Sequence, residues 1–148
     1  MYVLKGYIYA TSKIIKVKTR LNAKYIVLTY FIAFVWCING IVKLFDLVPR
    51  HRLIVERILG SEYSGLLTKA IGFLELFMCL WVLSGIKMKL NTALQIAVVA
   101  MMNTMEYFIV PDILLWGKLN AFFALLFIIL IYIRFVCASK LSRVNAVG

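Results

Sequence analysis

The sequence has few of the charged residues with which soluble proteins cover their surface. Only 16% of its 148 residues are charged and only 6 are acidic, whereas 64% are apolar. A soluble domain typically has about 25% charged and about 45–50% apolar residues. A soluble chain of this size also has too much surface for so few polar groups to cover. The composition therefore excludes an ordinary soluble domain and indicates that much of the surface faces lipid.

Residue types that hold metals or carry redox chemistry are also scarce. The chain has one histidine and three cysteines, and no two cysteines have the Cys-x-x-Cys spacing of a metal site or a dithiol centre. Cys37, Cys79 and Cys137 each fall inside an apolar stretch, where a free cysteine usually packs as a small hydrophobe. We therefore predict no metal site and no bound cofactor from these residues.

Four apolar stretches are long enough to cross a bilayer, whose hydrocarbon core of about 30 Å needs about 20 helical residues. Glycine or proline residues separate them, and no internal repeat is visible. The sequence predicts an all-α fold, an integral membrane four-helix bundle. We expect a basic cytoplasmic segment at residues 1–24, the transmembrane domain at 25–138 and a cytoplasmic tail at 139–148. The four spans are predicted at Tyr25–Leu47, Gly65–Ile86, Leu90–Val110 and Leu119–Ala138.

A short charged segment, Pro49–Leu59, lies between the first two spans. Its apolar residues would share one face of a helix and its charged residues the other, and Gly60 would end that helix. It is too short to span, so we predict an amphipathic interfacial helix that covers one mouth of the bundle. A solvated loop is the alternative.

Lysine and arginine predict the orientation, since cytoplasmic loops carry the excess of both. With both termini in the cytoplasm, the inner side holds eleven basic residues, including Lys5 and Lys13, and the outer side six. We therefore predict a multi-pass protein of the cell membrane with both termini cytoplasmic. The basic residues flank apolar runs and form no aromatic-interleaved patch, so the expected partner is the lipid bilayer and not nucleic acid.

Several polar residues fall inside the predicted spans, where a charge costs roughly 2.5–3.5 kcal/mol. Their spacing places one polar stripe on each of the first three spans. These stripes should converge on an outward-opening polar pocket beneath the amphipathic segment. The candidate ligand-binding residues are Trp36, Asn39, Lys43, His51, Glu75, Asn103 and Glu106.

Some of these polar residues have a purely structural alternative. Asn39 and Gln95 are expected to hydrogen-bond neighbouring helices, and Lys43 could pair with Glu75 or Glu106 as a buried strut. For the two acids we favour function, because two acids and a lysine exceed what packing requires.

Other residues carry simpler expectations. Gly40 and Gly72 would permit close helix approach, and the indole N–H of Trp36 should find a partner inside the bundle. His51 could ionise near neutral pH, but a residue of this kind is more often an ordinary interfacial side chain. Arg134 is expected to extend to the inner membrane surface.

The order and spacing of several short motifs resemble the DoxX-like family of small membrane proteins, over about residues 25–135. The resemblance implies a four-helix integral membrane fold. Some relatives are membrane subunits linked to thiosulfate oxidation and quinone reduction, and distant relatives are associated with membrane-protein assembly or trafficking. The motifs lie at residues 35–44 (VWCINGIVKL), 48–51, 54–60, 72–76, 81–85, 102–106, 111–112 and 114–117.

These observations favour a non-catalytic membrane protein that binds an amphipathic or lipid-like ligand, or a partner subunit, in the pocket. One alternative is a membrane subunit of a quinone-linked oxidoreductase, in which Glu75 or Glu106 relays protons. The other is a small proton-coupled transporter. The chain lacks a redox cysteine pair and a histidine pair for haem, so we do not expect it to carry a redox cofactor by itself, although the oxidoreductase alternative would use a quinone. Whether it is an enzyme, and whether it forms oligomers, stay open.

Overall fold

A computed structural model of the chain describes residues 2–114 and 116–147, with side chains for 15–114 and 116–146. Within these ranges there are helices and turns but no strand, which confirms the all-α prediction. The side chains of Lys5 and Lys13, and residue 115 of the family motif, lie outside the described residues. The elements are α1 (Tyr2–Leu44), α2 (Pro49–Leu59), α3 (Ser64–Ser84), α4 (Met88–Ile109), a short 3-10 turn η1 (Gly117–Leu119) and α5 (Asn120–Val147).

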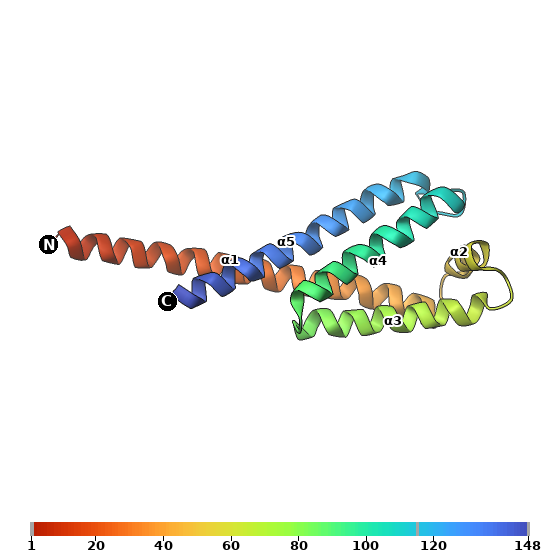
Figure 1. The fold of residues 1–148 in the computed structure, drawn as a ribbon, viewed down its shortest axis with the longest axis horizontal. Helices are drawn as coiled ribbons and strands as arrows, with labels where there is room; N and C mark the ends of the chain where they lie inside the picture. Colours follow the sequence, from red (N-terminus) through yellow and green to blue (C-terminus); the bar gives the residue numbers. More distant parts are fainter. Residues whose placement is uncertain (1, 115, 148) are drawn as a thin grey trace.

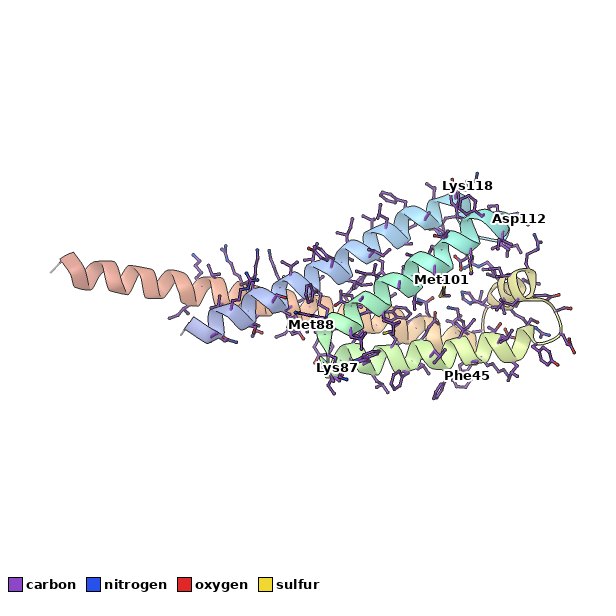
Figure 2. The ribbon with its side chains drawn as sticks, in the orientation of Figure 1. Phe45, Lys87, Met88, Met101, Asp112 and Lys118 are labelled. Carbon is purple, nitrogen blue, oxygen red and sulfur yellow. The ribbon has the colours of Figure 1, made fainter. Side chains whose placement is uncertain are left out.

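Four helical segments of the described chain are long and apolar enough to cross a membrane, as predicted. Many of their large apolar side chains point away from the bundle, as Figure 2 shows. Phe73, Leu74 and Phe108 each keep more than 60% of their surface exposed. A helix that is apolar on its outer face as well as its inner face is typical of a membrane span. The four segments are Ile15–Leu44, Ser64–Ser84, Met88–Ile109 and Gly117–Ala146.

Helix α1 is much longer than the span predicted from Tyr25. Its 43 residues correspond to about 65 Å at 1.5 Å per residue, roughly twice the thickness of the bilayer core. The basic segment continues the helix because residues 2–24 contain no proline and a single glycine, Gly6. Helix α5 likewise runs on through residue 138 to Val147. The beginning of α1 and the end of α5 lie at the same end of the molecule (Figure 1).

The helices associate as two pairs, α1 with α3 and α4 with α5, and α1 also packs along α5. Helices α3 and α4 follow each other in the chain but make little contact. The two pairs diverge toward the end of the bundle where α2 lies (Figure 1), which we call the α2 end. This divergence leaves room for a cavity between the pairs.

Helix α2 has the predicted boundaries and covers the α2 end of the bundle. Proline at its first position suits a helix start, and Gly60 ends it with a positive φ of 97° while its N–H donates to the carbonyl of Glu56. Ile54 and Val55 are buried, and Ile54 packs with Val110 and Leu114. The amphipathic helix is therefore confirmed, and the solvated-loop alternative is wrong.

The α1–α3 contact rests on Gly40 and Gly72, as expected. A Cβ added to Gly40 would lie 2.8 Å from the carbonyl oxygen of Gly72, and one added to Gly72 would lie 2.8 Å from that of Gly40. The Leu76 side chain fills the space beside Gly40. Only glycine leaves the room that this backbone-to-backbone contact needs.

The expectation that Arg134 reaches the membrane surface is wrong, because its side chain is completely buried. Its Nε donates to Thr29 Oγ1 at 2.9 Å, its Nη2 to the Val82 carbonyl at 2.8 Å and its Nη1 to Asn91 Oδ1 at 3.5 Å. The carbonyls of the last turn of a helix lack helical partners and favour a cation. Val82 lies in the last turn of α3, so Arg134 of α5 joins α1, α3 and α4 around that helix end.

We predict that Gly40→Ala lowers the stability of the bundle by about 1–3 kcal/mol, because the new methyl group would overlap a backbone atom of α3. The measurement is thermal unfolding of the purified protein in detergent. Gly65→Ala is the matched control, since its Cβ would meet nothing closer than 3.8 Å and alanine favours a helix. Equal unfolding temperatures for Gly40→Ala and the wild type would contradict the contact.

Candidate ligand-binding cavity

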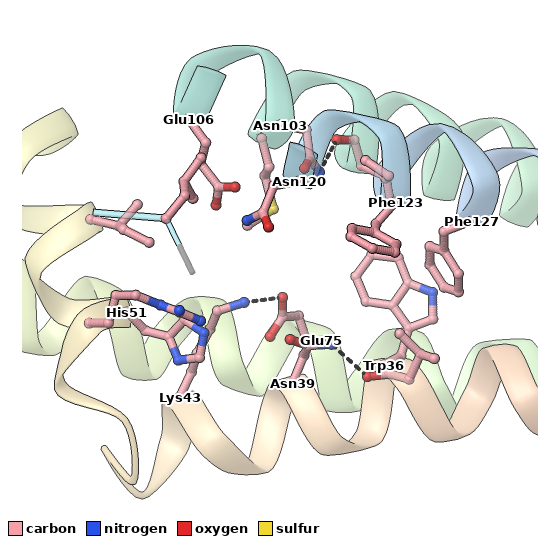
Figure 3. Close-up of a pocket in the computed structure, with 17 residues that line it drawn as sticks. Trp36, Asn39, Lys43, His51, Glu75, Asn103, Glu106, Asn120, Phe123 and Phe127 are labelled. Carbon is pink, nitrogen blue, oxygen red and sulfur yellow. Dashed lines mark hydrogen bonds and ion pairs between the residues drawn. The ribbon is translucent and has the colours of Figure 1, made fainter. Parts of the chain in front are cut away.

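A cavity of about 330 Å³ lies between the helix pairs next to α2 (Figure 3). The structure brings all of the predicted site residues together around it. Their role in binding stays a prediction. They are Trp36, Asn39 and Lys43 from α1, His51 from α2, Glu75 from α3, and Asn103 and Glu106 from α4.

The sequence analysis missed the contribution of α5. Asn120, Phe123 and Phe127 all line the cavity, and their spacing of three and four residues places them on one face of the helix. A polar residue at the start of an otherwise apolar helix was the signal available in the sequence. Arg50, next to His51 on α2, also lines the cavity and was not assigned to it.

A buried ion pair crosses from α1 to α3 at the cavity wall. Lys43 Nζ donates to Glu75 Oε1 at 2.5 Å, and the two residues are only 7% and 6% exposed. Lys43 therefore forms the expected strut, with Glu75 and not with Glu106. The other carboxylate oxygen, Glu75 Oε2, is buried without a hydrogen-bond partner among the described residues.

Glu106 extends from α4 toward this ion pair (Figure 3). Within the described part of the chain, ion pairs join Lys43 to Glu75 and Arg57 to Asp112, and none involves Glu106. The charges that act on Glu106 are those of Lys43, Arg50 and Glu75. The two acids of the site thus share one cavity, as the sequence predicted, and Glu106 keeps its carboxylate oxygens free of an ion pair.

The two asparagines use their donors within their own helices. Asn39 Nδ2 donates to the Val35 carbonyl and Asn103 Nδ2 to the Val99 carbonyl, both at 2.9 Å. The expectation that Asn39 hydrogen-bonds a neighbouring helix is therefore wrong. One N–H of each NH₂ group is engaged in this way, so each amide retains its oxygen, an acceptor, and its second N–H.

Aromatic residues close the deeper end of the cavity. The ring centroids of Trp36 and Phe127 are 6.3 Å apart, and Phe123 lies beside them (Figure 3). Trp36 Nε1 donates to Gln95 Oε1 at 2.9 Å, and Gln95 Nε2 donates to Asn91 Oδ1 at 2.7 Å. This confirms both the buried indole partner and the interhelical role of Gln95. The cavity is therefore charged near α2 and aromatic about two helical turns, roughly 10 Å, deeper.

His51 is neutral at neutral pH, which contradicts the alternative that it ionises there. Burial lowers its pKa from 6.5 to about 4, with the positive charges of Lys43 and Arg50 adding to the effect and Asp46 opposing it. Its Nδ1 is also buried without a partner among the described residues. His51 therefore adds a polar but uncharged ring to the cavity.

Two cysteines that are far apart in the sequence meet in the bundle. Cys79 of α3 is a buried member of the core cluster, Cys37 of α1 packs against that cluster, and the two thiols are close enough to influence each other. Cys37 and Cys79 are 42 residues apart in the sequence, so their spacing along the chain gives no sign that the two helices bring them together. In the described residues no group of three or more His, Cys, Asp or Glu side chains is arranged to hold a metal.

Because the pKa of His51 is lower in the folded protein than in the unfolded chain, folding should become less favourable as the pH falls from about 6.5 to about 4. In that window the unfolded state binds the additional proton. We predict that the unfolding temperature of the wild type falls more steeply over this window than that of His51→Gln. Parallel curves between pH 8 and pH 4 would contradict the lowered pKa.

Comparison with known proteins gives one match. A sequence model described as the DoxX-like family matches residues 33–132. Every residue that lines the cavity, from Val35 to Phe127, falls within that range. No curated protein and no solved structure matches the chain.

Proposed function

Since the chain belongs to the DoxX-like family, we propose that it binds a small, uncharged amphipathic molecule in the cavity at the α2 end. The observation that carries the proposal is Glu75 Oε2, a buried acceptor that faces the cavity without a donor. A buried acceptor left unpaired costs about 1–3 kcal/mol. A ligand group that donates a hydrogen bond would remove this cost.

The charges of the cavity favour a ligand without net charge. When Glu75 and Glu106 are both ionised, Lys43 and Arg50 balance their charges, and His51 is neutral. A charged ligand in this cavity would have no opposite charge left to pair with, and burying an unpaired charge away from water is costly.

The acceptors that line the cavity favour a ligand that donates hydrogen bonds, and Arg50 Nε, a buried donor without a partner among the described residues, favours one that also accepts. The cavity presents Glu75 Oε2, the carboxylate of Glu106 and the amide oxygens of Asn39 and Asn103 as acceptors. An alcohol, a phenol or an amide N–H would match them. The apolar part of such a molecule would pack on the aromatic residues at the deeper end. The volume of about 330 Å³ lies at the small end of the usual range for ligand sites, about 300–1,000 Å³.

We predict that the protein purified from membranes carries a neutral molecule detectable by native mass spectrometry. Glu75→Gln should lower its occupancy by at least about tenfold, since a hydrogen bond to a charged group contributes about 1.5–3 kcal/mol. Glu62→Gln, an exposed acid outside the cavity, should keep the molecule.

Because Glu75→Gln also removes the partner of Lys43, Asn103→Leu provides a second variant that leaves the ion pair intact. Both variants should unfold near the temperature of the wild type, which would show that the bundle around the cavity is still folded. An unoccupied wild type whose unfolding temperature does not respond to added alcohols, phenols or amides would refute the proposal. The mass itself separates the alternatives, because a hydroquinone would support the quinone-linked function and a lipid fragment would support simple binding.

We further propose that both terminal segments are cytoplasmic and that the cavity lies toward the outer surface. The excess of lysine and arginine at the end of the bundle opposite α2 supports this orientation. In a cysteine-free background, a membrane-impermeant maleimide should label Ser61→Cys in intact cells and Ser142→Cys only after permeabilisation. Both positions are exposed. The reverse pattern would overturn the orientation.

A further inference from the structure

We propose that Cys37 of α1 and Cys79 of α3 form a reversible disulfide inside the bundle. The inference concerns the α1–α3 interface and does not depend on the ligand of the cavity. It gives a chemical role to two side chains that the proposed function leaves unused.

The first support is the alignment of the two helices. α1 and α3 run antiparallel, and Gly40 lies against Leu76. Cys37 comes three residues before Gly40, and Cys79 comes three residues after Leu76. One helical turn from that contact, the two cysteines therefore oppose each other. The two thiols are neighbours in the core, where Cys79 is buried and Cys37 packs against the same cluster.

The second support is the small separation of the helices. A disulfide joins Cα atoms about 4.4–6.8 Å apart, and facing Cα atoms of two helices are this close when the axes are no more than about 9–11 Å apart, since each Cα lies about 2.3 Å from its own axis. The contact between Gly40 and Gly72, in which an added Cβ would approach the opposite carbonyl to 2.8 Å, brings these backbones unusually close. The glycine contact therefore holds α1 and α3 close enough for facing cysteines one turn away to be joined.

The reaction removes one hydrogen atom from each thiol and forms one S–S bond. A diazene such as azodicarboxamide takes up both hydrogens, so its N=N bond becomes the N–N bond of a hydrazine as the thiols are oxidised. The pair lies among the apolar side chains of the core, with Cys79 buried and Cys37 half-buried. The oxidant must therefore be soluble in lipid. The disulfide would link α1 and α3 one turn below the cavity wall that holds Glu75.

The three cysteines of the chain make the test simple, because Cys137 lies on α5, outside this core cluster. Membranes are treated with azodicarboxamide, and the remaining thiols are counted in denaturing detergent. The wild type should fall from three free thiols to one, and Cys137→Ala from two to none, both as monomers. Cys37→Ala and Cys79→Ala should each keep two. A reducing agent should restore all of the lost thiols.

Peptide mapping of the oxidised wild type provides a readout that needs no variant. It should show the peptides of Cys37 and Cys79 joined to each other and lighter by two hydrogen atoms. A wild type that keeps three thiols, a loss that persists in Cys37→Ala, or a dimer linked through Cys137 as the sole product would each overturn the proposal.

Discussion

The contact between Gly40 and Gly72 is the constraint on which the rest of the structure depends. The Lys43–Glu75 ion pair stands beside this contact, and Cys37 and Cys79 stand one turn farther from α2. A Cβ on Gly72 would lie 3.0 Å from the Cβ of Lys43 as well as 2.8 Å from backbone atoms of α1. Any larger residue would therefore separate the helices where the ion pair forms.

Most of the fold could be predicted from the sequence, because its main features are local. A span is recognised from an apolar run of sufficient length, and α2 from the alternation of its apolar and charged faces between Pro49 and Gly60. The length of α1 could not be predicted in the same way. A basic segment marks where the apolar run begins, but a helix continues through it wherever no residue breaks it.

The candidate site could be predicted in part for a different reason. Glu75 and Glu106 attract attention because an acid inside a span is costly, and this holds without knowledge of the fold. The aromatic residues of α5, Phe123 and Phe127, give no such signal, since aromatic residues are ordinary in any span. The thiol pair depends on the pairing of α1 with α3, which no local pattern reports.

The burial of Arg134 bears on the order in which the bundle is assembled. All of the acids that pair within the described chain lie toward the α2 end, so this guanidinium is held by a hydroxyl, an amide and a backbone carbonyl. On its own, a helix carrying that charge would enter lipid at a cost of a few kcal/mol, roughly 2.5–3.5 near the centre. Thr29, Val82 and Asn91 all precede α5 in the chain. The groups that receive the charge are therefore synthesised before it, so a helix that inserts in chain order would find its binding partners already in the membrane.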